Sequence, residues 1–115
     1  MAANESITWV RVARRSDLAS GEALAVTVAG TEVAICDLKG RVHAFDNICT
    51  HEYACLSDGF IEGEEIECPL HQARFHIPTG RALTPPACIG LRVHPIKVEG
   101  EDIYVGHIDR ARTET

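Results

Sequence analysis

The chain has 115 residues, 45% of them hydrophobic, which allows one domain with a modest core and no second catalytic domain. Seventeen acidic residues against eleven basic ones give a net charge of −6, which argues against a nucleic acid partner and favours partners with a basic surface. The first eight residues carry no cationic start or apolar core, and no run of eighteen apolar residues occurs, so we expect a cytoplasmic protein without membrane association.

Short runs of β-branched and alternating residues predict an all-β chain. One helical turn is expected at Ser16 to Leu18, where Ser16 supplies a cap. Tight turns such as Ala29-Gly30 and Lys39-Gly40 separate the predicted strands into hairpins. The expected strands are Trp9 to Val12, Ala23 to Val28, Thr31 to Leu38, Val42 to Phe45, Phe60 to Ile61, Glu65 to Glu67, Arg74 to Ile77, Arg81 to Leu83, Leu91 to Val98 and Ile103 to Val105.

Three stretches interrupt the strand pattern. Alternation stops at Asp46, and the composition up to Gly59 predicts a loop. Thr84 to Cys88 holds two consecutive prolines, which cannot donate ladder hydrogen bonds, so a rigid connection is expected there. Asp109 to Thr115 is polar and is expected to fray.

Two thiol and imidazole pairs form the most informative pattern in the chain. Cys49-Thr50-His51 is followed, after sixteen residues, by Cys68-Pro69-Leu70-His71. Together the pairs offer two soft thiolates and two nitrogen donors, a set that binds zinc or an iron-sulfur cluster. Zinc motifs usually pair Cys with Cys and His with His, whereas here the two types are interleaved. A 2Fe-2S centre, a structural zinc site and a chance spacing all remain open on the residues alone.

The remaining cysteines and histidines have no second ligand at metal spacing. Cysteines at positions 36, 49, 55, 68 and 88 are odd in number and scattered, which does not indicate a disulfide framework. Cys36 and Cys88 lie among apolar neighbours and are expected to be inert buried thiols. We expect structural or surface roles for His43, His76, His94 and His107.

At the two ligand pairs the chain resembles the Rieske ferredoxins of bacterial aromatic-ring-hydroxylating dioxygenases. Arg74-Phe75, Thr79-Gly80 and Thr84 to Ala87 extend the resemblance, which covers Trp9 to Val105. It implies an antiparallel β sandwich or barrel, with a cluster-binding subdomain at about residues 46–84 inserted into a single domain spanning 1–115.

The resemblance also implies a site and a function. Cys49 and Cys68 would hold the inner iron of a 2Fe-2S cluster, and His51 and His71 the outer iron nearer the surface. The chain would carry single electrons from an NAD(P)H-dependent flavoprotein reductase to a terminal oxygenase, as a monomer and without catalysis of its own. A Cys2His2 zinc-binding interaction module is the alternative, and Glu52 in the first loop is the expected partner contact.

The second ligand loop differs from that of respiratory Rieske proteins, which resembles C-P-C-H-G-S-x-Y. Leu70 stands where those proteins have a further cysteine, so Cys55 has no partner for an inter-loop disulfide. Ala73 and Phe75 stand where a serine and a tyrosine hydroxyl would donate hydrogen bonds to the cluster and its cysteine sulfur. Because such bonds favour the reduced state, their absence predicts a potential at the low end of the Rieske range.

Overall fold

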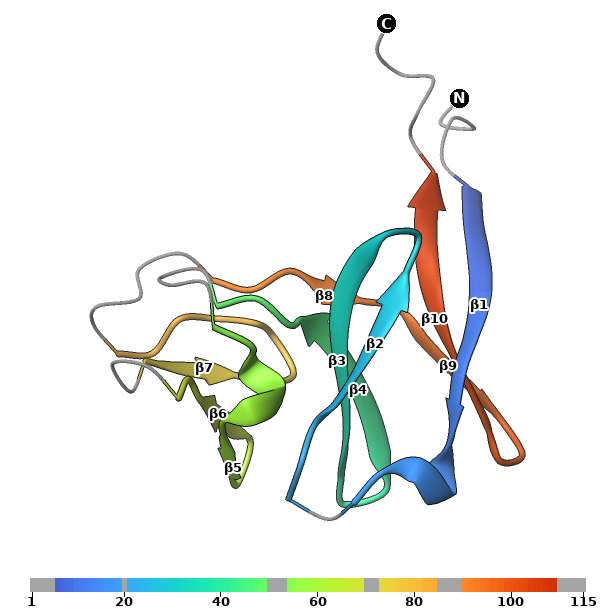
Figure 1. Cartoon of the computed structure of the whole chain (residues 1–115). Coiled ribbons are helices and arrows are strands. Elements are labelled where there is room, and N and C mark those ends of the chain that lie inside the picture. The colour runs from blue at the N-terminus through green and yellow to red at the C-terminus, as the bar shows by residue number, and fades with distance from the viewer. Residues whose placement is uncertain (1–5, 20, 50–53, 70–72, 85–89, 110–115) are drawn as a thin grey trace, which may run out of the picture.

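A computed structural model describes residues 6–19, 21–49, 54–69, 73–84 and 90–109 (Figure 1). In these residues ten strands form three sheets, and every strand pair is antiparallel. None of the helices in these ranges is long and apolar enough to span a membrane. The elements are β1 (Ser6–Arg14), η1 (Arg15–Asp17), β2 (Leu24–Val28), β3 (Thr31–Leu38), β4 (Arg41–Asp46), η2 (Leu56–Asp58), β5 (Phe60–Glu62), β6 (Glu65–Glu67), β7 (Arg74–His76), β8 (Val93–His94), β9 (Ile96–Glu99) and β10 (Asp102–Asp109), where η marks a single 3-10 turn.

Two of the sheets share one apolar core. The first sheet has the order β1-β10-β9, and the second has the order β2-β3-β4-β8. Side chains from both sheets meet in a common buried cluster, which is the arrangement of a β sandwich. The buried members of this first core are Ala13, Val28, Val33, Ile35, Val42, Ala44, Ile103 and Val105.

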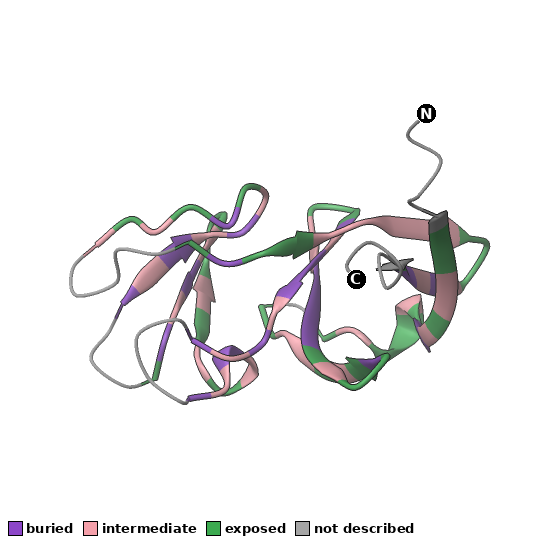
Figure 2. Ribbon diagram, turned by 90° about the horizontal axis from the view of Figure 1, so that it is seen from above, coloured by how far each residue is buried: buried purple, intermediate pink, exposed green. Residues whose placement is uncertain are grey.

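The central strand β3 is buried on both faces, because its alternate side chains enter different cores. Val33 and Ile35 point into the first core, whereas Ala34 and Cys36 belong to a second one. Successive side chains of a strand lie on opposite faces, so an unbroken apolar run is what a strand covered on both sides requires. The sheet β2-β3-β4-β8, called the middle sheet below, therefore separates two apolar layers. Figure 2 shows buried residues in both halves of the molecule.

The third sheet, β5-β6-β7, lies next to the face of the middle sheet that is turned away from the first core. Ile66 and Phe75 face each other across β6 and β7 and are both fully buried in the second core. That core also contains Phe45 from β4, so it joins the small sheet to the rest of the molecule. Its buried members are Ala34, Cys36, Phe45, Cys49, Ala54, Leu56, Ile66, Cys68, Ala73, Phe75, Ile77 and Leu91.

The predicted all-β fold is confirmed, with differences at some boundaries. The first strand runs from Ser6 to Arg14, longer than expected, because β10 pairs with it throughout apart from one register shift. The predicted strand at Arg81 to Leu83 is wrong, since only one bridge, from Ala82 to Phe75, forms there. The expected strand from Leu91 to Val98 is divided at Pro95, which has no N–H to donate to a ladder.

The remaining differences concern the connections. One 3-10 turn, Leu56–Asp58, lies inside the stretch from Asp46 to Gly59 that was expected to be loop alone. The expected helical turn near Ser16 is present one residue earlier than predicted. Most of the proline-containing connection and of the polar tail lies outside the described residues.

Gly59 is the point at which the chain leaving the first loop touches the strand entering the second. A Cβ atom at Gly59 would overlap the carbonyl oxygen of Glu67, which belongs to backbone and cannot turn away. Gly63, in the turn between β5 and β6, has open space around the same position but a φ of +62°. A side chain is thus excluded at Gly59 by lack of space and disfavoured at Gly63 by the backbone conformation.

We expect Gly59→Ala to lower the free energy of unfolding by about 2 to 3 kcal/mol, because β6 must shift to accommodate the methyl group. Gly63→Ala, which introduces strain but no overlap, should lower it by about 1 kcal/mol. Denaturant unfolding followed by circular dichroism measures both values. A Gly59→Ala variant as stable as Gly63→Ala would contradict the close approach of loop and strand.

Candidate metal centre

The two predicted ligand loops are built alike. The N–H of Cys49 donates to the carbonyl of Ala54 at 2.9 Å, and the N–H of Cys68 donates to the carbonyl of Ala73 at 2.7 Å. Each cysteine therefore opens a loop that its own backbone closes five residues later. The residues just outside are paired in the same way, since Ile48 bridges Cys55 as Glu67 pairs with Arg74.

Both loop cysteines lie in the second core, which places two sulfur donors in one dry environment. Cys49 is 4% exposed and Cys68 is fully buried, and both belong to the cluster that contains Phe45 and Phe75. A thiolate in such surroundings is stable only if a cation or a strong hydrogen-bond donor is close to it. Two equally built loops that direct cysteines into one core are suited to holding a positively charged metal group.

A buried asparagine anchors the first loop. Asn47 is fully buried, and its side-chain oxygen accepts a 2.8 Å hydrogen bond from the N–H of Ser57. Its carbonyl accepts from Leu56 at 2.7 Å, and its side-chain amide donates to Glu32 at 3.3 Å. Asn47 thus ties both ends of the first loop to each other and to β3.

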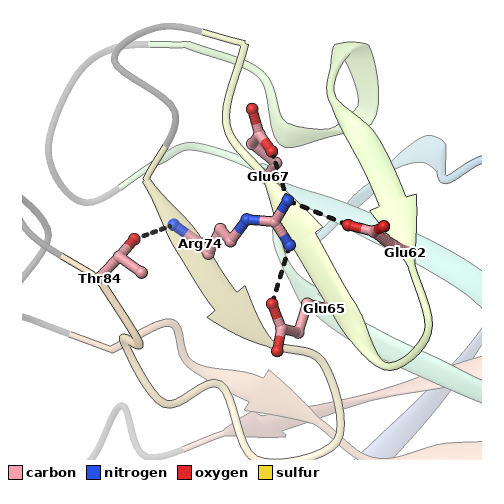
Figure 3. Close-up of polar contacts among 5 residues, drawn as sticks. All are labelled: Glu62, Glu65, Glu67, Arg74 and Thr84. Carbon is pink, nitrogen blue, oxygen red and sulfur yellow. Dashed lines mark hydrogen bonds and ion pairs between the residues drawn. The ribbon is translucent and has the colours of Figure 1, made fainter.

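An arginine anchors the end of the second loop, as Figure 3 shows. Arg74 donates through Nη1 to Glu65 at 2.9 Å and through Nη2 to Glu62 at 3.0 Å and Glu67 at 2.9 Å. Its backbone N–H donates to the hydroxyl of Thr84 at 3.0 Å. Hydrogen bonds to Glu65, and next to Glu62, raise the pKa of Arg74, so the guanidinium stays positive at every physiological pH.

The structure describes only part of the predicted site. Cys49 and Cys68 lie as described above, whereas His51, His71 and Glu52 fall outside the described residues. Cys36 is fully buried in the same core, and burial, followed by the charge of Asp37, raises its pKa to about 12, as expected of an inert thiol. Leu70 and Cys88 also lie outside the described residues.

The other four histidines are distributed over the sheets. Burial lowers the pKa of His43, with a smaller effect from a neighbouring arginine, so its ring is neutral at pH 7. His94 lies 2.8 Å from a carboxylate oxygen of Asp46, and His107 is exposed. The ring of His76 contacts a threonine hydroxyl at 2.8 Å and a glutamate carboxylate at 3.2 Å.

Asn47 and Arg74 are the two residues of the site whose roles the sequence did not reveal. Asn47 lies in a stretch that reads simply as loop, and nothing in its neighbours signals that it is buried. A signal for Arg74 was available, because Glu62, Glu65 and Glu67 fall on one face of a predicted hairpin whose next strand begins at Arg74.

The sequence matches the Rieske [2Fe-2S] domain family over residues 8–95. The chain belongs to the Rieske family. The ferredoxin component of the naphthalene 1,2-dioxygenase system of Pseudomonas putida is 45% identical to it over 100 residues, which cover 87% of this chain and 96% of that protein.

Solved Rieske structures have the same fold. The ferredoxin of carbazole 1,9a-dioxygenase from Nocardioides aromaticivorans IC177 matches with a TM-score of 0.82 and 38% identity, covering 85% of this chain and 96% of that one. A chain from a complex of reduced oxygenase and oxidized ferredoxin in carbazole 1,9a-dioxygenase matches with a TM-score of 0.78 and 31% identity, over 84% and 99% of the two chains.

These matches confirm four predictions. The resemblance to ferredoxins of dioxygenase systems is confirmed, as is the Rieske fold. The cofactor of the family is a Rieske 2Fe-2S cluster, and the two buried sulfurs fit its inner iron in number and type. The relatives are ferredoxin components, which are electron carriers and not catalysts.

Proposed function

We propose that this Rieske protein carries single electrons from an NAD(P)H-dependent flavoprotein reductase to a terminal aromatic-ring-hydroxylating oxygenase. The observation that carries the proposal is the pair of equally closed loops that direct Cys49 and Cys68 into one apolar core. The ferredoxin relatives of naphthalene, biphenyl and carbazole dioxygenase systems support the same assignment.

Four residues are proposed as ligands. Cys49 and Cys68 would hold the inner iron, since both are buried, and His51 and His71 the outer iron, since each follows its cysteine within the same short loop. When bound, such a cluster accepts one electron, and its formal charge changes from zero to minus one. The flanking residues 46–84 would act as the cluster-binding subdomain of a single domain.

The protein's contribution is to hold the ligands and to exclude water. Packing of Phe45, Leu56 and Phe75 around the cysteines keeps solvent from the sulfurs and limits rearrangement when charge arrives. Ala73 and Phe75 are fully buried and carry no hydroxyl, so neither side chain donates a hydrogen bond to a nearby sulfur. Fewer donors at the sulfurs make the reduced state less favourable and so lower the potential, which favours passing the electron on to an oxygenase centre of low potential.

Partners and location follow from the same proposal. A complex of an oxygenase with a related ferredoxin supports the oxygenase as electron acceptor. The net charge of −6 suits brief encounters with basic surfaces on both partners. We propose that the carrier works as a monomer in the cytoplasm, where NAD(P)H is available.

Ligand assignment is tested by cysteine replacement. Cys49→Ser and Cys68→Ser should abolish cluster binding, because each removes one of two thiolates from the inner iron. Purified wild-type protein should contain about two iron and two acid-labile sulfide per chain, and Cys36→Ser, the matched change within the same core, should keep them.

Metal analysis and absorption spectra can contradict the cluster and its ligand assignment. A colourless wild-type protein with one bound zinc would support the zinc-binding module instead. A red-brown Cys49→Ser variant with full iron content would remove Cys49 from the ligand set.

Electron transfer from the reductase should slow as salt rises. Because the Debye length falls from about 30 Å at 0.01 M to about 8 Å at 0.15 M, steering of an acidic carrier weakens over this range. Stopped-flow measurements should show a loss of about tenfold in the bimolecular rate constant. Reduction by a small neutral donor is the control, and equal salt dependence for both donors would reject steering.

The reduction potential should lie near −150 mV, roughly the lower limit for Rieske centres. Ala73→Ser combined with Phe75→Tyr should raise it by on the order of 100 to 200 mV, since each hydroxyl adds a donor to a charged acceptor. Protein-film voltammetry measures both values. A midpoint above zero in the wild type would exclude the dioxygenase type of carrier, and an unchanged double variant would exclude the hydrogen-bond explanation.

A further inference from the structure

The outer face of the small sheet carries an unusual concentration of charge. Phe60, Glu62, Glu65, Glu67, Arg74 and His76 lie on this face, because Phe60 pairs with Glu67, Glu62 with Glu65, and Glu67 with Arg74 across the three strands. The inner face is apolar, with Ile66 and Phe75 fully buried. One arginine thus stands among three carboxylates, which leaves a net charge of −2 when all are ionised.

This arginine is adjacent to the second ligand loop. Arg74 directly follows Ala73, whose carbonyl accepts the hydrogen bond from Cys68, and Glu67 directly precedes Cys68. Both ends of the loop are therefore joined by the 2.9 Å contact between Arg74 and Glu67. The side chain of Arg74 is 31% exposed and that of Glu67 only 20%, so this contact is better protected from water than a typical surface ion pair.

We propose that Arg74 is a positioning residue for electron transfer: it closes the second ligand loop and offsets the negative charge of three glutamates beside it. The proposal depends on Cys68 being a cluster ligand. Reduction adds one electron and no proton, so a fixed positive charge next to the loop favours the reduced state, whereas the glutamates oppose it. The guanidinium contacts all three carboxylates at once through two nitrogens, which the single ammonium of a lysine is poorly shaped to do.

Replacement of Arg74 separates its charge from its shape. Arg74→Gln should lower the equilibrium constant for reduction about threefold, or roughly 30 mV at 59 mV per tenfold. Arg74→Lys keeps the charge and should remain close to the wild-type potential. Both variants should release the cluster at a lower temperature, because neither closes the loop as arginine does.

The matched control is Arg11→Gln. Arg11 forms a 2.9 Å ion pair with Asp102 in the first sheet, so its loss changes the net charge equally but away from the ligand loops. It should change neither the potential nor the temperature of cluster release. Glu62→Gln changes a side chain that is 77% exposed, so little packing is lost, and it should shift the potential upward.

Voltammetry and thermal release of iron decide the outcome. Equal potentials for Arg74→Gln and Arg11→Gln, or no upward shift in Glu62→Gln, would overturn the electrostatic role. Release of the cluster from Arg74→Lys at the wild-type temperature would overturn the positioning role. Wild-type protein without iron would refute the ligand proposal instead, so the two failures are distinguishable.

Discussion

The arrangement of the candidate site depends on the second core, in which two separate loops pack against one face of the middle sheet. Cys49 and Cys68 are separated by eighteen residues, yet both are buried with Phe45 and Phe75. Because the middle sheet is itself held from behind by the first core, its face cannot yield when the loops pack on it. The distance between the two cysteines is therefore set by packing and not by the loops alone.

Much of this arrangement could be predicted from local sequence patterns. Turn residues and period-two alternation located the hairpins of the first two sheets, since these elements are stabilised by neighbours in sequence. The run from Val33 to Cys36 is apolar throughout, which already indicates a strand covered on both faces. The two candidate ligand cysteines could be singled out because the chemistry of metal binding limits both residue type and spacing.

The features that could not be predicted are contacts across irregular turns and loops. Arg81 to Leu83 has the composition of a strand, but only Ala82 forms a bridge. The ladder ends on either side because the N–H groups of Arg74 and Arg81 donate to threonine hydroxyls instead of to backbone carbonyls. Asn47 looks like any loop asparagine until Ser57 and Leu56 fold back onto it. In each case the deciding partner is seven to ten residues away, across a turn whose geometry no local pattern specifies.

The two loops are closed in the same way by their backbones but anchored by opposite kinds of side chain. Asn47 is neutral and fully buried, and its hydrogen bonds are little affected by ions in solution. Arg74 is charged and partly exposed, and its contacts with three glutamates weaken as salt screens them. The anchoring contacts beside Cys49 are consequently little affected by salt, whereas those beside Cys68 are weakened by it.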